Sequence, residues 1–208
     1  MSMENDACIS LKIIIIGDSN VGKSTFFKKV QNKEINIYKE PSTIGLDFAR
    51  IFYNIDNKSI KVHLWDTAGQ EKYQCIIKSY FREICGIILM FDVSNENSFN
   101  NLKKWLDLTT MEKRCNHTHP ILLLGNKNDL PNGINPRELN AFIKIHNVQY
   151  HEISSNNNNL EEMFKAFVSN IIRNEDIKDC KGVKHTSSEN ENITLIMKKT
   201  KNLFCCFN

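Results

Sequence analysis

The sequence predicts an α/β protein with a doubly wound, six-stranded and mostly parallel sheet that carries helices on both faces. Short apolar runs alternate along the chain with segments of helical periodicity, the order that produces parallel strands joined by crossing helices. Two apolar runs are instead separated only by Asp56-Asn57-Lys58, a hairpin signal. One edge strand should therefore be antiparallel, and functional loops should lie at the carboxyl ends of the strands.

Apolar content justifies each of the expected strands. Leu11–Ile16 is a continuous Ile-rich run, typical of a strand buried on both faces, and Gly86–Asp92 has the same character. Phe48–Ile55 and Ser59–Trp65 flank the hairpin turn. The last two expected strands are Ile121–Leu124 and Tyr150–Ile153.

Between most of these strands, apolar side chains recur at helical spacing, so those intervals are expected to hold helices. The polar segment Asn32–Ser42, which contains Pro41, reads instead as an exposed loop. The expected helices are Thr25–Gln31, Ile76–Glu83, Phe99–Leu108 with Ser98 near its start, Leu139–His146 and Leu160–Ile171.

Bulk composition favours a soluble globular protein. Hydrophobic residues make up 41% and charged residues 25% of the 208 positions. No apolar run approaches the ~20 residues that span a bilayer, and the polar segment 1–10 does not read as a secretory signal. The 7 cysteines are odd in number and mostly isolated, which argues against a disulfide scaffold or zinc site and favours a reducing, cytosolic setting.

The formal net charge of +3 is concentrated at the end of the chain. Residues 178–208 hold 6 Lys and 3 acidic residues, whereas residues 1–177 hold 21 basic and 21 acidic residues. The body of the protein therefore does not favour nucleic acid as a partner. Because apolar periodicity fades from about Glu175, we expect a short extension over 1–10, a folded domain over 11–174 and a flexible tail over 175–208.

Gly17–Ser24 reads G-x-x-x-x-G-K-S, the phosphate-loop pattern, between the first strand and the first helix. In this context backbone N–H groups and a helix N-terminus point at one anion, and the glycines allow close approach. Lys23 is expected to reach the β/γ-phosphates and the Ser24 hydroxyl to bind Mg²⁺. A chance glycine turn is the alternative. The residues expected at the phosphates are Ser19, Asn20, Val21, Gly22, Lys23, Ser24 and Thr25.

A second signal, Trp65-Asp66-Thr67-Ala68-Gly69-Gln70, follows the third strand. Asp66 is placed to hold the Mg²⁺ shell through water, the Gly69 N–H to meet a γ-phosphate, and Gln70 to orient an attacking water. Asp and Gly are also common in ordinary turns, so this interpretation depends on the phosphate loop that precedes it.

A third signal, Asn126-Lys127-Asn128-Asp129, follows the fifth strand. The Asp129 carboxylate can accept from both N1–H and the 2-amino group of guanine, a pair of donors that adenine lacks. Lys127 can lie along the base plane, and Asn126 can brace the loops. Four polar residues after a strand are ordinary loop material by themselves, but their place after a later parallel strand favours a base site.

Together these residues resemble the Ras superfamily of small GTPases, and within it the Rab family, over roughly residues 11–174. Ser42–Phe48 is similar to the Rab effector loop, in which Thr43 binds Mg²⁺ in the GTP state. Other Rab-like segments are Lys61–Trp65, Ser79–Arg82 and Ser98–Trp105. Phe48, Trp65 and Tyr80 match the aromatic trio that Rab effectors read, although core packing would also explain such residues. The resemblance implies a P-loop small GTPase domain.

The chain departs from the family pattern in three places. Ser154-Ser155-Asn156 stands where the family has S-A-K beside the base, so Ser155 keeps a backbone N–H for guanine but Asn156 lacks the Lys stem. Tyr38 is the only aromatic before the effector loop that could stack on guanine, with Ile37 as the alternative. Lys72 replaces the customary Arg after Gln70-Glu71.

The end of the chain, Cys205-Cys206-Phe207-Asn208, follows a basic segment and favours double prenylation. Two lipid chains, or one chain with basic residues, anchor stably, and each Lys near an anionic leaflet adds ~1 kcal/mol. Ile193–Ile196 resembles the hydrophobic motif that prenylation escort proteins grip in Rab tails. Two unmodified cysteines are the alternative.

The resemblance implies a GTP/GDP-switched regulator of vesicle trafficking that uses Mg²⁺ and hydrolyses GTP slowly, with Gln70 and Lys23 as catalytic residues. An activating protein should supply an arginine finger, worth about 10³–10⁵ in rate for Ras-type enzymes. The other implied partners are an exchange factor, a GDP-dissociation inhibitor, an escort protein and membrane-tethering effectors. The implied location is the cytoplasmic face of endomembranes, with a cytosolic pool.

Two other functions remain open. A P-loop kinase of a small molecule would share Gly17–Ser24, but it should carry an Arg-rich lid and gives Asn126–Asp129 no role. A GTP-loaded membrane scaffold with little hydrolysis is favoured by the altered Ser155-Asn156 and opposed by the presence of Gln70.

Overall fold

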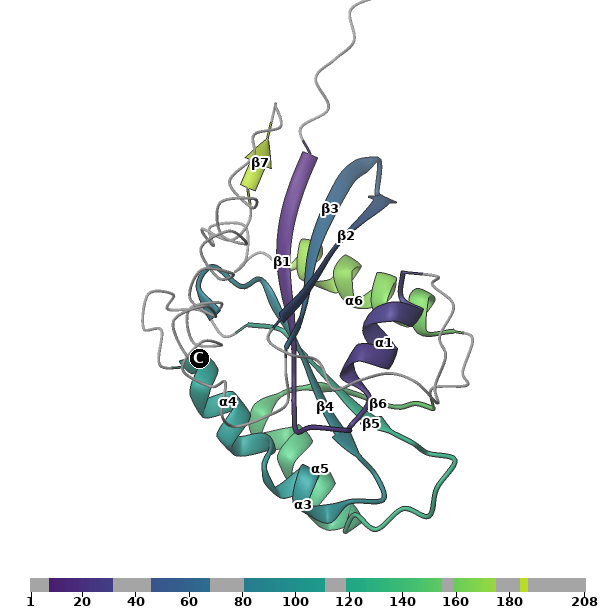
Figure 1. The fold of residues 1–208 in the computed structure, drawn as a ribbon. Helices are drawn as coiled ribbons and strands as arrows, with labels where there is room; N and C mark the ends of the chain where they lie inside the picture. The colour runs from purple at the N-terminus through teal and green to yellow at the C-terminus, as the bar shows by residue number, and fades with distance from the viewer. Residues whose placement is uncertain are drawn as a thin grey trace, which may run out of the picture.

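The computed structural model describes residues 8–31, 46–67, 81–110, 119–154, 159–174 and 184–186 (Figure 1). The strands are β1 (Cys8–Ile16), β2 (Leu46–Ile55), β3 (Lys58–Thr67), β4 (Gly86–Asp92), β5 (Ile121–Asn126), β6 (Gln149–Glu152) and β7 (Lys184–Thr186). The main sheet has the order β2-β3-β1-β4-β5-β6, in which β2–β3 is the antiparallel pair. The expected six-stranded, mostly parallel sheet with an antiparallel edge strand is confirmed.

Helices cover both faces of this sheet, as the alternation of the strands and helices predicts (Figure 1). The described helices are α1 (Lys23–Lys29), α3 (Glu96–Asn100), α4 (Leu102–Thr110), α5 (Pro136–His146) and α6 (Leu160–Arg173). Ile13 and Ile15 of β1 pack in the cluster that contains residues of α1 and α6. Ile14 and Ile16 pack on the opposite face, with residues of α3, α4 and α5.

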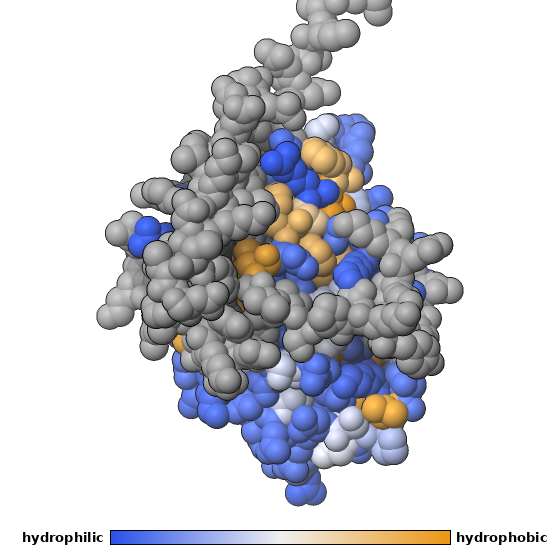
Figure 2. Space-filling view, viewed as in Figure 1, coloured by the Kyte–Doolittle hydropathy of each residue, from blue (hydrophilic) through white to orange (hydrophobic). Residues whose placement is uncertain are grey.

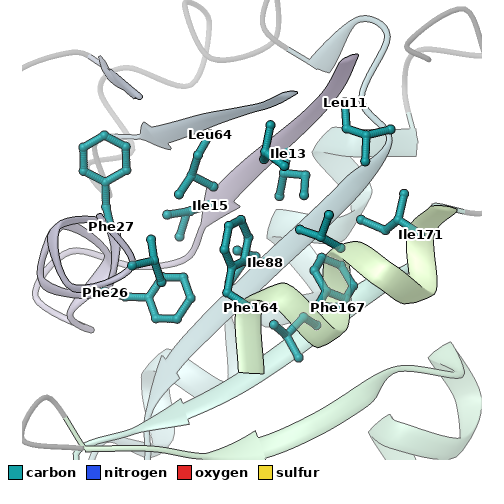
Figure 3. Close-up of a cluster of buried hydrophobic side chains, with 14 of the residues drawn as sticks. Leu11, Ile13, Ile15, Phe26, Phe27, Leu64, Ile88, Phe164, Phe167 and Ile171 are labelled. Atoms are coloured by element: carbon teal, nitrogen blue, oxygen red, sulfur yellow. The ribbon is translucent and has the colours of Figure 1, made fainter. Parts of the chain in front are cut away.

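Aliphatic and aromatic side chains pack together between β1 and the helices α1 and α6 (Figure 3). Phe26 of α1 meets Phe164 of α6 edge-on, with ring centroids 6.2 Å apart. Phe164 and Phe167 are 0% and 1% exposed, so this cluster fixes α1 against the sheet. Since α1 begins directly after the phosphate loop, the core also fixes one end of that loop.

The surface is more polar than this interior. In Figure 2 the lower part of the coloured surface is mostly hydrophilic, while apolar residues gather in its upper part. Among the described residues, the large apolar side chains that stay exposed are Phe52, Leu130 and Ile145. None of the described helices has the length and apolar character needed to cross a membrane.

β7 departs from the expectation that regular structure ends near Glu175. Cys8, Ile9 and Ser10 pair antiparallel with Lys184–Thr186, whereas β1 pairs with β4 only from Ile13 onward. Along the edge that faces β4 further on, residues 8–10 of β1 have no β4 partner for their backbone groups. β7 supplies this partner through main-chain hydrogen bonds. Such pairing needs no apolar pattern, which is why the sequence of this segment did not reveal it.

A helix boundary also differs from the expectation. The expected helix over Phe99–Leu108 is two helices, and the first begins at Glu96, so Ser98 lies near its start as expected. Asn95 is the N-cap, because its side chain accepts a hydrogen bond from the backbone N–H of Asn97. The Ser98 hydroxyl instead bonds the carbonyl of Asn95 at 2.7 Å. The helix expected over Ile76–Glu83 lies mostly outside the described residues.

The carboxyl ends of the parallel strands meet along one edge of the sheet. Ile15 lies beside Asp66 at the ends of β1 and β3, and Asp92 lies beside Asn126 at the ends of β4 and β5. Each of the three sequence signals therefore begins at the end of a strand at this edge.

Candidate nucleotide-binding site

The loop Gly17–Gly22 makes a turn that only glycine fits at its two ends. Gly17 has φ +144°, and a Cβ there would lie 2.2 Å from the carbonyl oxygen of Met90. Gly22 has φ +99°, and a Cβ there would lie 2.1 Å from Nδ2 of Asn126. Both positions combine a left-handed backbone with a close neighbour, which is the situation that requires glycine.

Lys23 is folded over this loop. Its Nζ donates to the carbonyl of Gly17 at 2.9 Å and to that of Asp18 at 2.6 Å, and the residue is only 5% exposed. Burial lowers the pKa of Lys23 to about 8, against the opposing effect of the Asp66 and Asp18 carboxylates. A buried ammonium is stabilised by an anion, so a phosphate group at this loop would be a favourable partner.

Ser24 and Asp66 form the second part of the site. The Ser24 hydroxyl donates to Oδ2 of Asp66 at 2.6 Å. Asp66 is fully buried, and its Oδ1 has no hydrogen-bond partner among the described residues. Burial raises the pKa of Asp66 to about 6, although the Ser24 hydrogen bond and the Lys23 charge oppose that shift.

These oxygens fit a magnesium ion. Mg²⁺ binds oxygen ligands, and it usually takes only one or two carboxylates together with phosphate oxygens and waters. A buried carboxylate oxygen without a partner, beside a hydroxyl, matches that need. No group of three or more His, Cys, Asp or Glu side chains in the described ranges could hold a metal by itself.

Asn126 joins the phosphate loop to the predicted base loop. Its Nδ2 donates to the carbonyl of Val21 at 2.8 Å, across 105 positions of sequence, and the residue is 2% exposed. The backbone N–H of Asn128 donates to the carbonyl of Ile153 at 3.1 Å. The Ser154 hydroxyl donates to Oδ1 of Asp129 at 2.7 Å. The loops after β1, β5 and β6 are thus tied together.

Lys127 is held by a carboxylate that sequence reasoning missed. Its Nζ lies 2.6 Å from Oδ2 of Asp92, and its backbone has φ +66°. Ser94 donates to the other Asp92 oxygen from both its N–H and its hydroxyl. Burial acts to raise the pKa of Asp92, but the bonds from Lys127 and Ser94 outweigh it and hold that pKa below its ordinary value. The sequence did carry one indication of this contact, because Asp92 is an acidic residue at the end of the apolar strand β4.

The structure brings together one part of the predicted site. All of its members lie at strand ends, on loops or at the start of α1, at the same edge of the sheet: Ser19, Asn20, Val21, Gly22, Lys23, Ser24, Thr25, Asp66, Asn126, Lys127, Asp129 and Ser154. The remaining predicted residues lie outside the described ranges, and their roles stay predictions: Tyr38, Thr43, Gly69, Gln70, Ser155, Asn156, Cys205 and Cys206.

Comparison with known proteins agrees with this geometry. The model of the Ras family matches residues 12–173. The Ras-related protein Rab-11B of Dictyostelium discoideum is 40% identical over 156 residues, which cover 74% of this chain and 70% of that protein. The GTP-binding protein ypt3 of Schizosaccharomyces pombe is 33% identical over 217 residues, covering 99% of this chain and 100% of that protein. The Ras-related protein RIC2 of Oryza sativa is 34% identical over 176 residues, covering 82% and 78%. This chain belongs to the Ras family of small GTPases, with Rab-type proteins among its relatives.

Proposed function

We propose that this protein is a Rab-type GTPase that switches between GTP and GDP and regulates vesicle trafficking on the cytoplasmic face of endomembranes. The observation that carries the proposal is the convergence of the loops after β1 and β5 with the end of β3 at one edge of the sheet. There a buried ammonium, a buried carboxylate–hydroxyl pair and a buried amide lie at the loop that a phosphate would occupy. Relatives named as Rab and GTP-binding proteins support the same function.

Each group at the site has a role in binding GTP. The Lys23 ammonium would replace part of its hydrogen bonding to the Gly17 and Asp18 carbonyls with bonds to the β/γ-phosphates. The Asp129 carboxylate would accept hydrogen bonds from guanine. Asn126 holds the two loops at a fixed separation through the Val21 carbonyl. Mg²⁺, when bound, would neutralise phosphate charge, with Ser24, Thr43 and, through water, Asp66 as the residues that hold it.

Hydrolysis would depend on Gln70, which orients the attacking water, while Lys23 stabilises charge that develops on the γ-phosphate. Single-turnover GTP hydrolysis by purified protein tests this role. Gln70→Leu should slow hydrolysis at least about tenfold, since removing a positioning group costs roughly one or more decades in rate. Gln149→Leu, on the edge strand β6, is a matched control that should keep the wild-type rate.

An equal rate for the wild type and Gln70→Leu would contradict this role for Gln70. It would favour the second candidate, a GTP-loaded scaffold with little turnover, to which the sequence Ser155-Asn156 already points. Binding of ATP in preference to GTP would instead favour a kinase.

Membrane attachment would come from lipid on Cys205 and Cys206. Escort protein and GDP-dissociation inhibitor would handle the lipidated chain, an exchange factor and an activating protein would drive its cycle, and tethering effectors would bind its GTP form. A tagged double variant, Cys205→Ser with Cys206→Ser, should move from membrane to cytosol in fractionated cells. Cys180→Ser is the matched control and should stay on the membrane. If the Cys180→Ser variant also moved to the cytosol, that result would argue against lipid at Cys205 and Cys206.

A further inference from the structure

Asp18 lies inside the phosphate loop, and besides its electrostatic effect on Lys23 its carboxylate makes two hydrogen bonds to another part of the fold. One donor is Asn101, the residue between α3 and α4, and the other is Trp105, within α4. Asn101 Nδ2 donates to Oδ2 at 2.8 Å, and Trp105 Nε1 donates to Oδ1 at 2.7 Å. Asn101 and Trp105 stand 83 and 87 positions from Asp18, so this is a tertiary contact and not a local turn.

The chemistry of the donors and acceptors fixes this arrangement in one orientation. An indole N–H only donates and an ionised carboxylate only accepts, so Trp105 and Asp18 suit each other. The Asn101 amide is oriented from both sides, because its oxygen accepts from Lys104 Nζ at 2.8 Å while its nitrogen faces Asp18. Hydrogen bonds with an ionised partner are also stronger than neutral ones.

The same residue contacts Lys23 through its backbone. The Asp18 carbonyl accepts from Lys23 Nζ at 2.6 Å, the shorter of the two bonds that hold that ammonium. Asp18 is therefore held at its side chain by Asn101 and Trp105 and at its carbonyl by Lys23. Trp105 is 4% exposed and packs in the cluster beneath α3 and α4, so its indole is a fixed anchor for the loop.

We propose that Trp105 and Asn101 are positioning residues for nucleotide retention: by holding the Asp18 carboxylate, they fix the loop carbonyl that orients Lys23 toward the phosphates. This inference rests on the proposed function. It extends the binding site to residues that touch no nucleotide, and it gives α4 a direct mechanical connection to the phosphate loop.

The test is a double-mutant cycle on the dissociation of fluorescently labelled GDP, with full-length protein and fixed Mg²⁺. Trp105→Phe keeps an aromatic ring but removes the donor, and it should speed GDP release about tenfold, or one decade. In the Asp18→Ala background the same change should speed release less than twofold, because the bond is already absent. The cycle also cancels the separate effect of removing the Asp18 charge near phosphate.

Leu106→Val is the matched control, since it shortens the buried side chain next to Trp105 in α4, and a Leu side chain has no donor for the Asp18 carboxylate. It should leave GDP release unchanged even where it lowers the melting temperature. An equal effect of Trp105→Phe in both backgrounds would overturn the proposal and assign Trp105 a packing role only. Failure of the wild type to bind GDP would instead overturn the proposed function, together with this inference.

A spectroscopic readout follows the contact itself. The chain has only 2 tryptophans, so ¹⁵N-labelled protein should give two indole signals, of which Trp105→Phe assigns one. Asp18→Ala should move the proton of that signal to lower shift, as expected for the loss of a bond to a carboxylate. A signal that stays in place would overturn the proposal.

Discussion

Adding one methyl group at Gly22 should destabilise the protein, because the change acts at the contact between the phosphate loop and Asn126. The new Cβ would lie 2.1 Å from Asn126 Nδ2, so Asn126 must move away from the Val21 carbonyl that it bonds at 2.8 Å. Leaving these buried groups without a partner costs about 1–3 kcal/mol. The left-handed backbone, with φ +99°, adds about 1–2 kcal/mol for alanine. The expected total for Gly22→Ala is about 2–5 kcal/mol.

Equilibrium urea unfolding at fixed GDP and Mg²⁺ concentrations measures this cost, since bound ligand contributes to apparent stability. Gly133→Ala is the matched control, because the nearest atoms to its Cβ lie 3.9 Å away. It should change stability by less than about 1 kcal/mol. In the Asn126→Ala background there is no amide to displace, so Gly22→Ala should cost only the about 1–2 kcal/mol of its left-handed backbone. An undiminished cost in that background would refute the steric argument.

Three further predictions concern the ion pair, the core and the metal. Lys127→Met should lower the free energy of unfolding by about 1 kcal/mol at pH 7. The pKa of Asp92 is depressed when folded, so the pair stabilises above the unfolded value of 3.8 and is lost as pH falls through the folded value. The penalty should therefore shrink below that pH, and a pH-independent penalty would exclude the pair as its cause. Phe164→Ala, at a fully buried position, should cost about 3–5 kcal/mol, whereas Ile145→Ala, 76% exposed, should stay within about 0.5 kcal/mol by thermal unfolding. Chelation of Mg²⁺ should speed GDP release roughly tenfold or more in the wild type but barely in Asp66→Asn, and equal responses would argue against Asp66 at the metal.

The fold could be predicted from sequence because its strands are marked by composition. The expected strand Gly86–Asp92 coincides with β4, since all its residues are buried and nearly all are apolar. The expected hairpin is also present, with Asp56 and Asn57 both at positive φ, as a two-residue turn requires. β7 could not be predicted, because three residues that pair through backbone alone leave no pattern.

The candidate site could be predicted as a set of loops but not as a set of contacts. Motif spacing assigns Lys23 and Asp66 to one site, because Lys23 follows β1 and Asp66 lies near the end of β3, the neighbouring parallel strand. The bonds from Trp105 and Asn101 to Asp18 depend on side-chain geometry across more than 80 positions, which no periodicity encodes. The Lys127–Asp92 pair likewise arises only when β4 and β5 lie side by side.

The most direct test of the whole account is the choice of base. Protein stripped of nucleotide and titrated with GDP and with ADP, each with Mg²⁺, should prefer GDP by at least about 10³-fold. A site that hydrogen-bonds particular donors rejects a ligand lacking them by several decades. Equal affinity for the two nucleotides would contradict the assignment of Asn126–Asp129 to guanine and, with it, the proposed function.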